Sequence, residues 1–448
     1  MGSSNDKEVK VLEHQENLVK LRKEIEGKFL DRYEGNLVYK DIELDYYGKN
    51  FCHVLCLNEN FIDPRKPNIL LIHGFQGTSI SFNFMMNELK EYGNLYSIDL
   101  LGMANSSRPQ VHDLFKNASE WIEFYVGFIE KVVESLKFDK FYLIGHSLGG
   151  LLSGWYSVKN PEKVIKLTLF SPAGTTDFLK KNNDGTITEI KDHLQFGRTF
   201  AYTILNLIFK LKITFQDIYC IKIFNSWIKK GIIKRYRHIG VEENDIYGQL
   251  TEQIAQLPKD LDKMIFFVIS NPVPSATLPL EDKFEKLVSE NNFKIDYYYG
   301  ENDWMEYLGA QRLHQKFASN INFIIVTNSG HTFQIESPIK AAKLFLENNK
   351  ELIEMRNKRL EEDHLKKVDT IENVPDKMLS LKSFSDNNIN NADIKGDIDD
   401  EYFEEQIDDL IRKDEMNYEQ FVDKIVKHNS HNSNSESHEK EEEVNQKI

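Results

Sequence analysis

Apolar residues recur along the chain at two different periods, and these predict where helices and strands lie. Residues 7–33 combine charged side chains with apolar ones at helical spacing, so we expect residues 1–34 to form an amphipathic leader helix. Two β-like runs between residues 37 and 57 meet at a Tyr-Gly-Lys-Asn turn, a pattern typical of a β-hairpin. The chain is therefore predicted to enter its core through a leader helix and a hairpin.

After the hairpin, short buried strands alternate with helices, as expected for a parallel sheet that helices cover on both faces. The predicted strands are residues 68–72, 95–99, 141–144, 166–170, 294–299 and 322–327. The predicted helices are residues 81–91, 117–137 and 149–159. This order predicts an α/β fold with a mostly parallel central sheet.

One gap in the alternation is too long for a single helix. It separates the strands at 166–170 and 294–299, and we interpret residues 174–264 as a helical cap inserted over the site. The core of the fold is then formed by residues 35–173 and 265–348.

The net charge of -15 belongs mainly to the C-terminal part of the chain. Residues 351–448 contain 27 acidic and 14 basic residues, and long stretches of them lack core-forming side chains. We predict that residues 349–448 form an acidic, largely disordered tail. Within it, residues 401–427 have a helical pattern and are predicted to dock on a protein partner or on the body of the chain. This charge distribution argues against nucleic acid as a partner.

Cysteine usage and hydropathy indicate the compartment. The three cysteines have neither a metal-site spacing nor an even-numbered disulfide framework, which favours a reducing environment. The N-terminus lacks an apolar signal region, and no run of about 18 apolar residues occurs. We therefore expect a cytoplasmic protein that does not span a membrane.

A candidate nucleophile follows the strand at 141–144. The sequence Gly-His-Ser-Leu-Gly at residues 145–149 has the G-x-S-x-G pattern between a buried strand and a helix. In such an elbow the serine lies on a sharp, strained turn at the carboxyl edge of the sheet, and the flanking glycines leave room for that backbone. The pattern predicts Ser147 as the nucleophile, and the alternative is an ordinary helix N-cap.

A serine nucleophile needs a general base, and the base needs a carboxylate that orients it. Asp303 follows the strand at 294–299 and His331 follows the strand at 322–327, so both are expected at the same sheet edge as the serine. The chain order Ser147, Asp303, His331 is that of α/β hydrolases. Glu301 is the alternative acid, and a surface-loop role is the alternative for His331.

The glycine-rich turn after the strand at 68–72 supplies the last part of the predicted site. A developing oxyanion needs preorganised N–H donors, and the backbone amides of Phe75 and Leu148 are the predicted donors. We assign His73, in the same turn, to a hydrogen bond with the loop backbone. No metal and no cofactor are predicted for this chemistry.

The sequence DLLGMANSSRP at residues 99–109 resembles a loop of one branch of the α/β-hydrolase-domain family. That branch includes the lysophospholipase and N-acylphosphatidylethanolamine lipase and the lipid-droplet co-activator of triglyceride lipase. The resemblance covers about residues 35–348 and implies an α/β-hydrolase fold that acts on lipid esters. It also rests on the motifs at residues 73–77, 145–150, 171–174, 300–305 and 330–331.

The chain differs from this branch at positions that bear on activity. The co-activator has lost its nucleophile, whereas this chain keeps Ser147, so the resemblance implies hydrolysis. Branch members carry an H-x-x-x-x-D pattern linked to lysophosphatidate acyltransferase activity, but here Glu336 stands at the acidic position after His331. Ala104 also replaces the usual small glycine of the 99–109 loop. Acyl transfer therefore stays open.

The predicted cap has a composition suited to a lipid surface. Between Arg198 and Arg237 there are nine basic residues and one acidic residue, interleaved with aromatic and aliphatic side chains. Residues 198–237 are thus predicted to bind a membrane or lipid-droplet surface peripherally. The alternative is an ordinary cap core with solvated lysines.

Together these observations predict a serine hydrolase that cleaves a carboxylic ester of a phospholipid or lysophospholipid through an acyl-enzyme. Two other functions remain as alternatives. The first is a lysophospholipid acyltransferase, and the second is a non-catalytic regulator of a lipase or of a lipid surface.

Overall fold

The computed structural model describes residues 36–111, 113–178, 261–269 and 275–372, with shorter pieces at 20, 24–28, 30 and 210–212. Most of the predicted leader and cap, and the chain beyond residue 372, lie outside these residues. The predictions for residues 198–237 and 401–427 therefore stay predictions. The chain divides into two compact units, 1–368 and 369–448, and the elements below belong to the first apart from the end of the last helix.

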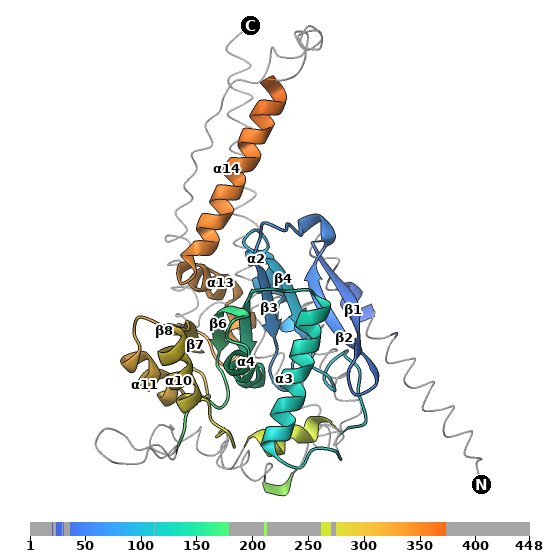
Figure 1. The fold of residues 1–448 in the computed structure, drawn as a ribbon, viewed down its shortest axis with the longest axis vertical. Coiled ribbons are helices and arrows are strands. Elements are labelled where there is room, and N and C mark those ends of the chain that lie inside the picture. The colour runs from blue at the N-terminus through green and yellow to red at the C-terminus, as the bar shows by residue number, and fades with distance from the viewer. Residues whose placement is uncertain are drawn as a thin grey trace, which may run out of the picture. The chain divides into compact units, whose positions relative to one another are not determined.

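An eight-stranded sheet forms the centre of the described fold, in the order β1-β2-β4-β3-β5-β6-β7-β8 (Figure 1). The hairpin strands β1 and β2 pair antiparallel, β2 joins β4 antiparallel, and all further pairs are parallel. The mostly parallel α/β fold predicted from the sequence is thereby confirmed. The strands are β1 (Leu37–Asp45), β2 (Lys49–Leu57), β3 (Asn68–Ile72), β4 (Asn94–Ile98), β5 (Phe141–His146), β6 (Val164–Phe170), β7 (Ile295–Gly300) and β8 (Ile321–Val326).

Helices cover both faces of this sheet. In β3, Leu70 and Ile72 belong to one hydrophobic cluster, whereas Ile69 and Leu71 belong to another, because successive strand residues point to opposite faces. Helices α3 and α4 contribute to the first cluster, and α2 and α13 to the second. The helices are η2 (Glu59–Phe61), η3 (Ser79–Phe82), α2 (Asn83–Leu89), α3 (Ala118–Ser135), α4 (Leu148–Lys159), η6 (Leu261–Met264), α9 (Ile265–Val268), α10 (Glu281–Asn291), α11 (Leu308–Lys316), α12 (Phe333–Glu336), α13 (Pro338–Glu347) and α14 (Lys350–Glu372).

The short described part of the N-terminal leader, residues 24–28, is helical and contacts the body. Glu26 is buried, and its carboxylate accepts a hydrogen bond from the side-chain amide of Asn105 and lies 3.0 Å from His53 Nε2. On its other side, His53 Nδ1 lies 2.5 Å from Asp41 in β1. A buried histidine thus joins the leader, the hairpin and the loop after β4.

Helix α14 is not among the predicted elements, and it extends the folded body beyond residue 348. Its sequence is rich in glutamate, lysine, arginine and leucine, which are strong helix formers. Leu352 is fully buried in the cluster with α2 and α13. Arg359 is 6% exposed and donates a 2.6 Å hydrogen bond to the carbonyl of Glu91. These buried contacts join a highly charged helix to the core.

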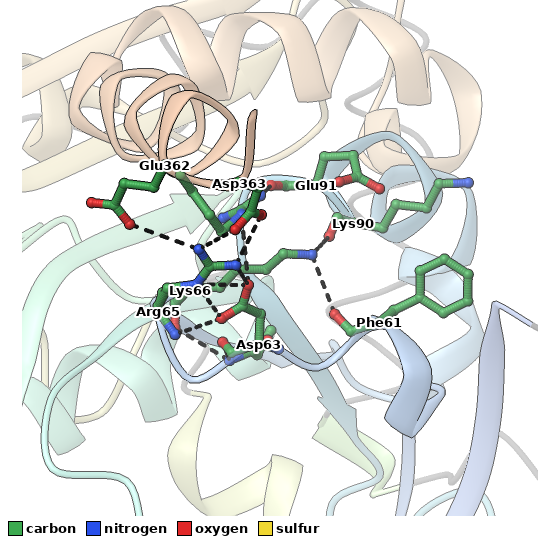
Figure 2. Close-up of polar contacts among 10 residues, drawn as sticks. Phe61, Asp63, Arg65, Lys66, Lys90, Glu91, Glu362 and Asp363 are labelled. Carbon is green, nitrogen blue, oxygen red and sulfur yellow. Dashed lines mark hydrogen bonds and ion pairs between the residues drawn. The ribbon is translucent and has the colours of Figure 1, made fainter. Parts of the chain in front are cut away.

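Exposed ion pairs surround this junction (Figure 2). The guanidinium of Arg65 contacts Asp63 in its own loop and Asp363 in α14, each at 2.7 Å. Lys66 donates to the carbonyl oxygens of Phe61 and Lys90. The loop between η2 and β3 therefore contacts α14 through the ion pairs of Arg65.

Candidate active site

The predicted catalytic residues gather at one edge of the sheet. Strands β5, β6, β7 and β8 are neighbours and run parallel, so the residues that follow them lie at the same carboxyl edge. Ser147 follows β5, Asp303 lies three residues beyond β7, and His331 lies in the loop after β8. Gly74 and Phe75 follow β3, which is the other neighbour of β5.

Ser147 occupies a strained turn between β5 and α4. Its φ of 54° and ψ of −117° lie in a region that non-glycine residues rarely adopt. Backbone hydrogen bonds hold this conformation, because the Ser147 N–H donates to Phe170 at 2.9 Å and its carbonyl accepts from Ala173 at 3.0 Å. The side chain is partly exposed. This is the conformation of a nucleophile elbow.

The glycines beside Ser147 are required by close backbone contacts. A Cβ on Gly149 would strike the carbonyl oxygens of Ile72 and His73, and one on Gly145 would strike the carbonyl of Gly149. The absence of side chains at both positions lets α4 start directly against β3. The G-x-S-x-G pattern is thus explained by packing on both sides of the serine.

The turn after β3 touches the nucleophile. A Cβ on Gly74 would lie 2.8 Å from the Ser147 Cβ. The N–H groups of Phe75 and Leu148 have no acceptor among the described residues, and Leu148 is the first residue of α4, where an N–H lacks an intrahelical partner. The N–H groups of Phe75 and Leu148 are therefore available to a ligand beside Ser147.

His73 has the backbone role that the sequence predicts. Its Nδ1 donates to the Gly74 carbonyl at 2.7 Å, and its Nε2 accepts from the Leu100 N–H at 3.0 Å. Complete burial lowers the pKa of the imidazole, so the ring is neutral and suited to both bonds. It ties the turn after β3 to the loop after β4.

Asp303 and His331 form a direct hydrogen bond. His331 Nδ1 donates to Asp303 Oδ1 at 2.9 Å, and both side chains are buried. This bond fixes the proton on Nδ1 and leaves Nε2 as the basic nitrogen. Glu301, the alternative acid, is exposed and accepts instead from the Asn328 N–H at 2.9 Å. The structure therefore pairs His331 with Asp303.

Asp303 is kept ionised by its surroundings. Burial raises the pKa of this carboxyl group, but its interaction with His331 and several hydrogen bonds outweigh burial, so the pKa lies below its ordinary value. The other donors are the hydroxyl of Ser171, which contacts Oδ2, and the Met305 N–H, which donates to Oδ1 at 2.9 Å. An ionised carboxylate is the form that can orient and stabilise a histidine base.

Two rings lie beside the His331 imidazole. The His146 ring centroid is 4.8 Å away, and His146 Nε2 donates to the His331 carbonyl at 2.8 Å. The Trp304 ring centroid is 4.9 Å away, and this side chain is 39% exposed. The described residues contain no hydrogen bond between the Ser147 hydroxyl and His331.

Comparison with known proteins agrees with this architecture. A sequence profile described as "alpha/beta hydrolase fold" matches residues 67–206. The Acinetobacter baumannii protein Lip1 has a similar structure, with a TM-score of 0.52, 16% identity, and coverage of 73% of this chain and 96% of its own. The chain has the α/β-hydrolase fold.

Curated proteins that this chain resembles include ABHD5 and proteins of related name. Human ABHD5, named a 1-acylglycerol-3-phosphate O-acyltransferase, is 37% identical over 112 residues, 24% of this chain and 30% of its own. An Arabidopsis thaliana protein of the same enzyme name is 26% identical over 284 residues, 61% of this chain and 64% of its own. Caenorhabditis elegans abhd-5.2 is 22% identical over 333 residues, 72% of this chain and 68% of its own. The chain thus spans less than two thirds of the plant relative.

Sequence reasoning missed contacts that three residues make at this site. Ser171 contacts Asp303, His146 donates to the His331 carbonyl, and Glu336 contacts the residues on either side of His331. Ser171 directly follows β6, so its place at the carboxyl edge was the signal that could have revealed it. Glu336 was noted from the sequence only as the acid of a pattern linked to acyl transfer, and no motif encodes the backbone contact of His146.

No helix among the described residues is both long enough and apolar enough to cross a membrane.

Proposed function

We propose that this protein is a serine hydrolase that cleaves a carboxylic ester of a lipid. The observation that carries the proposal is the hydrogen bond of the His331 imidazole to Asp303, at the same sheet edge as a serine in elbow conformation. A histidine held in this tautomer and a strained, accessible serine are the parts that acyl transfer requires. Phospholipids and lysophospholipids are the proposed substrates.

In the proposed mechanism, His331 Nε2 removes the Ser147 proton as the hydroxyl oxygen attacks the ester carbonyl. Apo structures often leave this serine–histidine contact unformed, and we expect it to close when substrate binds. The negative charge that develops on the carbonyl oxygen is stabilised by the Phe75 and Leu148 N–H groups. Asp303 stabilises the imidazolium that forms.

Collapse of the tetrahedral intermediate breaks the ester C–O bond, and His331 gives its proton to the departing alkoxide. The acyl group stays on Ser147. A water molecule then attacks this acyl-enzyme with His331 as the base, and the second collapse releases the fatty acid and restores the serine hydroxyl.

The lipid class is supported by the names of the relatives, which are acyltransferases that act on an acylglycerol phosphate. Those names also favour a second function, in which an alcohol such as lysophosphatidate replaces water in the second step. Both reactions share the acyl-enzyme, so the serine chemistry alone does not choose between them. We propose hydrolysis as the main reaction because Glu336 departs from the H-x-x-x-x-D pattern that is linked to acyl transfer.

Covalent labelling tests the nucleophile. A fluorophosphonate probe is expected to label the wild-type chain and to leave Ser147→Ala unlabelled. Ser289→Ala is the matched control, because Ser289 is an exposed serine on α10 far from any elbow, and it should label normally. A folded wild-type chain that takes no label would contradict the enzymatic proposal and favour the non-catalytic regulator.

Product analysis separates the two reactions. The wild-type chain is incubated with a lysophospholipid, with and without lysophosphatidate as an acyl acceptor, and lipids are resolved by mass spectrometry. Hydrolysis predicts release of free fatty acid as the main product in both mixtures. Phosphatidate as the main product would instead assign acyl transfer.

Peripheral lipid binding through residues 198–237 is a separate proposal, based on their basic and aromatic composition. The full chain is expected to pellet with vesicles that contain phosphatidylserine, and less with neutral phosphatidylcholine vesicles. Replacing the basic residues of this segment by glutamine should abolish the difference, and unchanged binding would count against the proposal.

A further inference from the structure

The carboxylate of Glu336 contacts the residues on both sides of the candidate base. One oxygen, Oε2, accepts a 2.5 Å hydrogen bond from the N–H of Gly330, which precedes His331. The other oxygen, Oε1, accepts a 2.7 Å hydrogen bond from the hydroxyl of Thr332, which follows it. The Glu336 side chain therefore bridges the two residues that flank His331.

Two further hydrogen bonds to backbone carbonyls support this bridge. The N–H of Glu336 donates to the Thr332 carbonyl at 3.0 Å. Because α12 is a single short turn of helix, its last residue, Glu336, lies close to the His331 loop that precedes it. The His331 carbonyl, in turn, accepts from His146 Nε2 at 2.8 Å. Glu336 thus holds the residues on either side of His331, and His146 holds the His331 carbonyl.

Such contacts bear on catalysis because a base must be placed within a fraction of an ångström of the proton it removes. Within the described parts of the chain, the His331 ring has one side-chain hydrogen bond, to Asp303. That bond orients the ring but does not prevent the loop from moving along the sheet edge. Contacts at Gly330 and Thr332 restrict that movement.

We propose that Glu336 is a positioning residue, which holds the loop of His331 and serves acylation and deacylation equally. This assignment rests on the proposed function. In the branch that the chain resembles, the acid at this position is linked to acyl transfer. Here both carboxylate oxygens are engaged by the histidine loop, so the group is a poor candidate for activating an acceptor alcohol. The choice between water and alcohol is then made elsewhere.

Partitioning of the acyl-enzyme tests the assignment. The probe is p-nitrophenyl butyrate with glycerol as the acceptor: p-nitrophenol reports turnover, and the ratio of butyrylglycerol to butyrate reports the choice of acceptor. For Glu336→Gln we expect kcat and kcat/KM to fall together by about tenfold, since the amide nitrogen cannot accept a hydrogen bond. The product ratio should equal that of the wild type.

Further variants separate positioning from a loss of fold. Glu336→Asp keeps both acceptor oxygens and should recover activity to within about threefold of the wild type. Thr332→Val removes only the hydroxyl donor and should give an intermediate loss. Glu301→Gln is the matched control, because Glu301 also accepts a backbone N–H in a nearby loop but does not contact His331 or its neighbours, and it should leave the rates unchanged. Thermal unfolding identifies any variant that fails to fold.

The outcomes are distinguishable. If Glu336→Gln lowers the ratio of butyrylglycerol to butyrate while kcat/KM stays constant, Glu336 acts on the acceptor alcohol, and the proposal is overturned. Unchanged rates in all Glu336 and Thr332 variants would also overturn it. If Glu336→Gln does not fold, Glu336→Asp and Thr332→Val decide by the same criteria. If the wild-type chain neither hydrolyses the ester nor takes the fluorophosphonate label, both the proposed function and this assignment are overturned. If the wild type is active but the Glu336 and Thr332 variants have wild-type rates, only this assignment is overturned.

Discussion

His331 and Asp303 are joined by a 2.9 Å hydrogen bond between side chains from two loops that are 28 residues apart. The bond is buried, and Asp303 accepts further hydrogen bonds from Ser171 and Met305. A carboxylate with this many donors is fixed in place and ionised, so it selects the tautomer of the histidine. The relationship gives the candidate base its orientation before any substrate arrives.

Replacing Asp303 by Asn should therefore inactivate the site while keeping its shape. The amide can present an N–H to His331 Nδ1 and favour the wrong tautomer, and we expect the rate of fluorophosphonate labelling to fall by about 10³–10⁴-fold. The labelling rate is measured by in-gel fluorescence against time. A fall of less than about tenfold in folded protein would contradict the assigned role.

Ser171→Ala should raise the pKa of Asp303. Loss of the hydroxyl removes one of the interactions that lower this pKa, so it moves towards its ordinary value. The test is an NMR titration of the Asp303 carboxyl carbon in both proteins, and coincident titration curves would refute the role of Ser171.

Gly74→Ala should impair the oxyanion turn. The added Cβ would lie 2.8 Å from the Ser147 Cβ, a distance that requires the turn or the elbow to shift. We expect kcat/KM to fall by at least about tenfold, because the Phe75 N–H moves with the turn. Gly27→Ala is the control: a Cβ there meets nothing within 4 Å and lies in a helix, so activity should not change.

His53 should make stability depend on pH. Burial lowers the pKa of this imidazole, but the hydrogen bond to Asp41, the close Glu26 carboxylate and the charge of Asp99 raise it more, to about 9. A folded-state pKa above the unfolded value of 6.5 adds stability that is fully present below pH 6.5 and is lost as the pH rises through about 9. The loss should be about 3 kcal/mol, because each unit of pKa difference corresponds to about 1.4 kcal/mol.

The measurement is urea unfolding at several pH values between 6 and 9.5. His53→Gln keeps a hydrogen-bonding side chain but cannot titrate, so its stability should change much less over this range. Equal pH dependence of the two proteins would show that another group is responsible.

Of the two arginines at the contact between α14 and the body, the more buried one should contribute more to the free energy of unfolding. Arg359 is 6% exposed and its guanidinium satisfies the Glu91 carbonyl, so Arg359→Ala should cost about 1–3 kcal/mol of unfolding free energy. Arg65 makes more ion pairs, but its side chain is 38% exposed and its ion pairs are screened by solvent, so Arg65→Ala should cost less than Arg359→Ala. Chemical denaturation of both variants gives the order, and a reversed order would contradict the argument.

Sequence by itself determined the alternation of strands and helices, the parallel sheet and the edge at which Ser147, Asp303 and His331 are found. These features are local or follow from chain order: a buried strand shows as an apolar run, and parallel strands bring their carboxyl ends to one edge. The glycines around the serine were also predictable, because a nucleophile elbow needs them.

Tertiary structure alone decided which carboxylate meets His331 and what holds the pair. Asp303 and Glu301 are two residues apart in one turn, and only the fold of that turn directs the first inward to Ser171, which is 132 residues away in sequence. Arg359 likewise contacts the carbonyl of Glu91, which is 268 residues away in sequence. That partner is a backbone atom, which carries no sequence signature, so only the packed structure could reveal the contact.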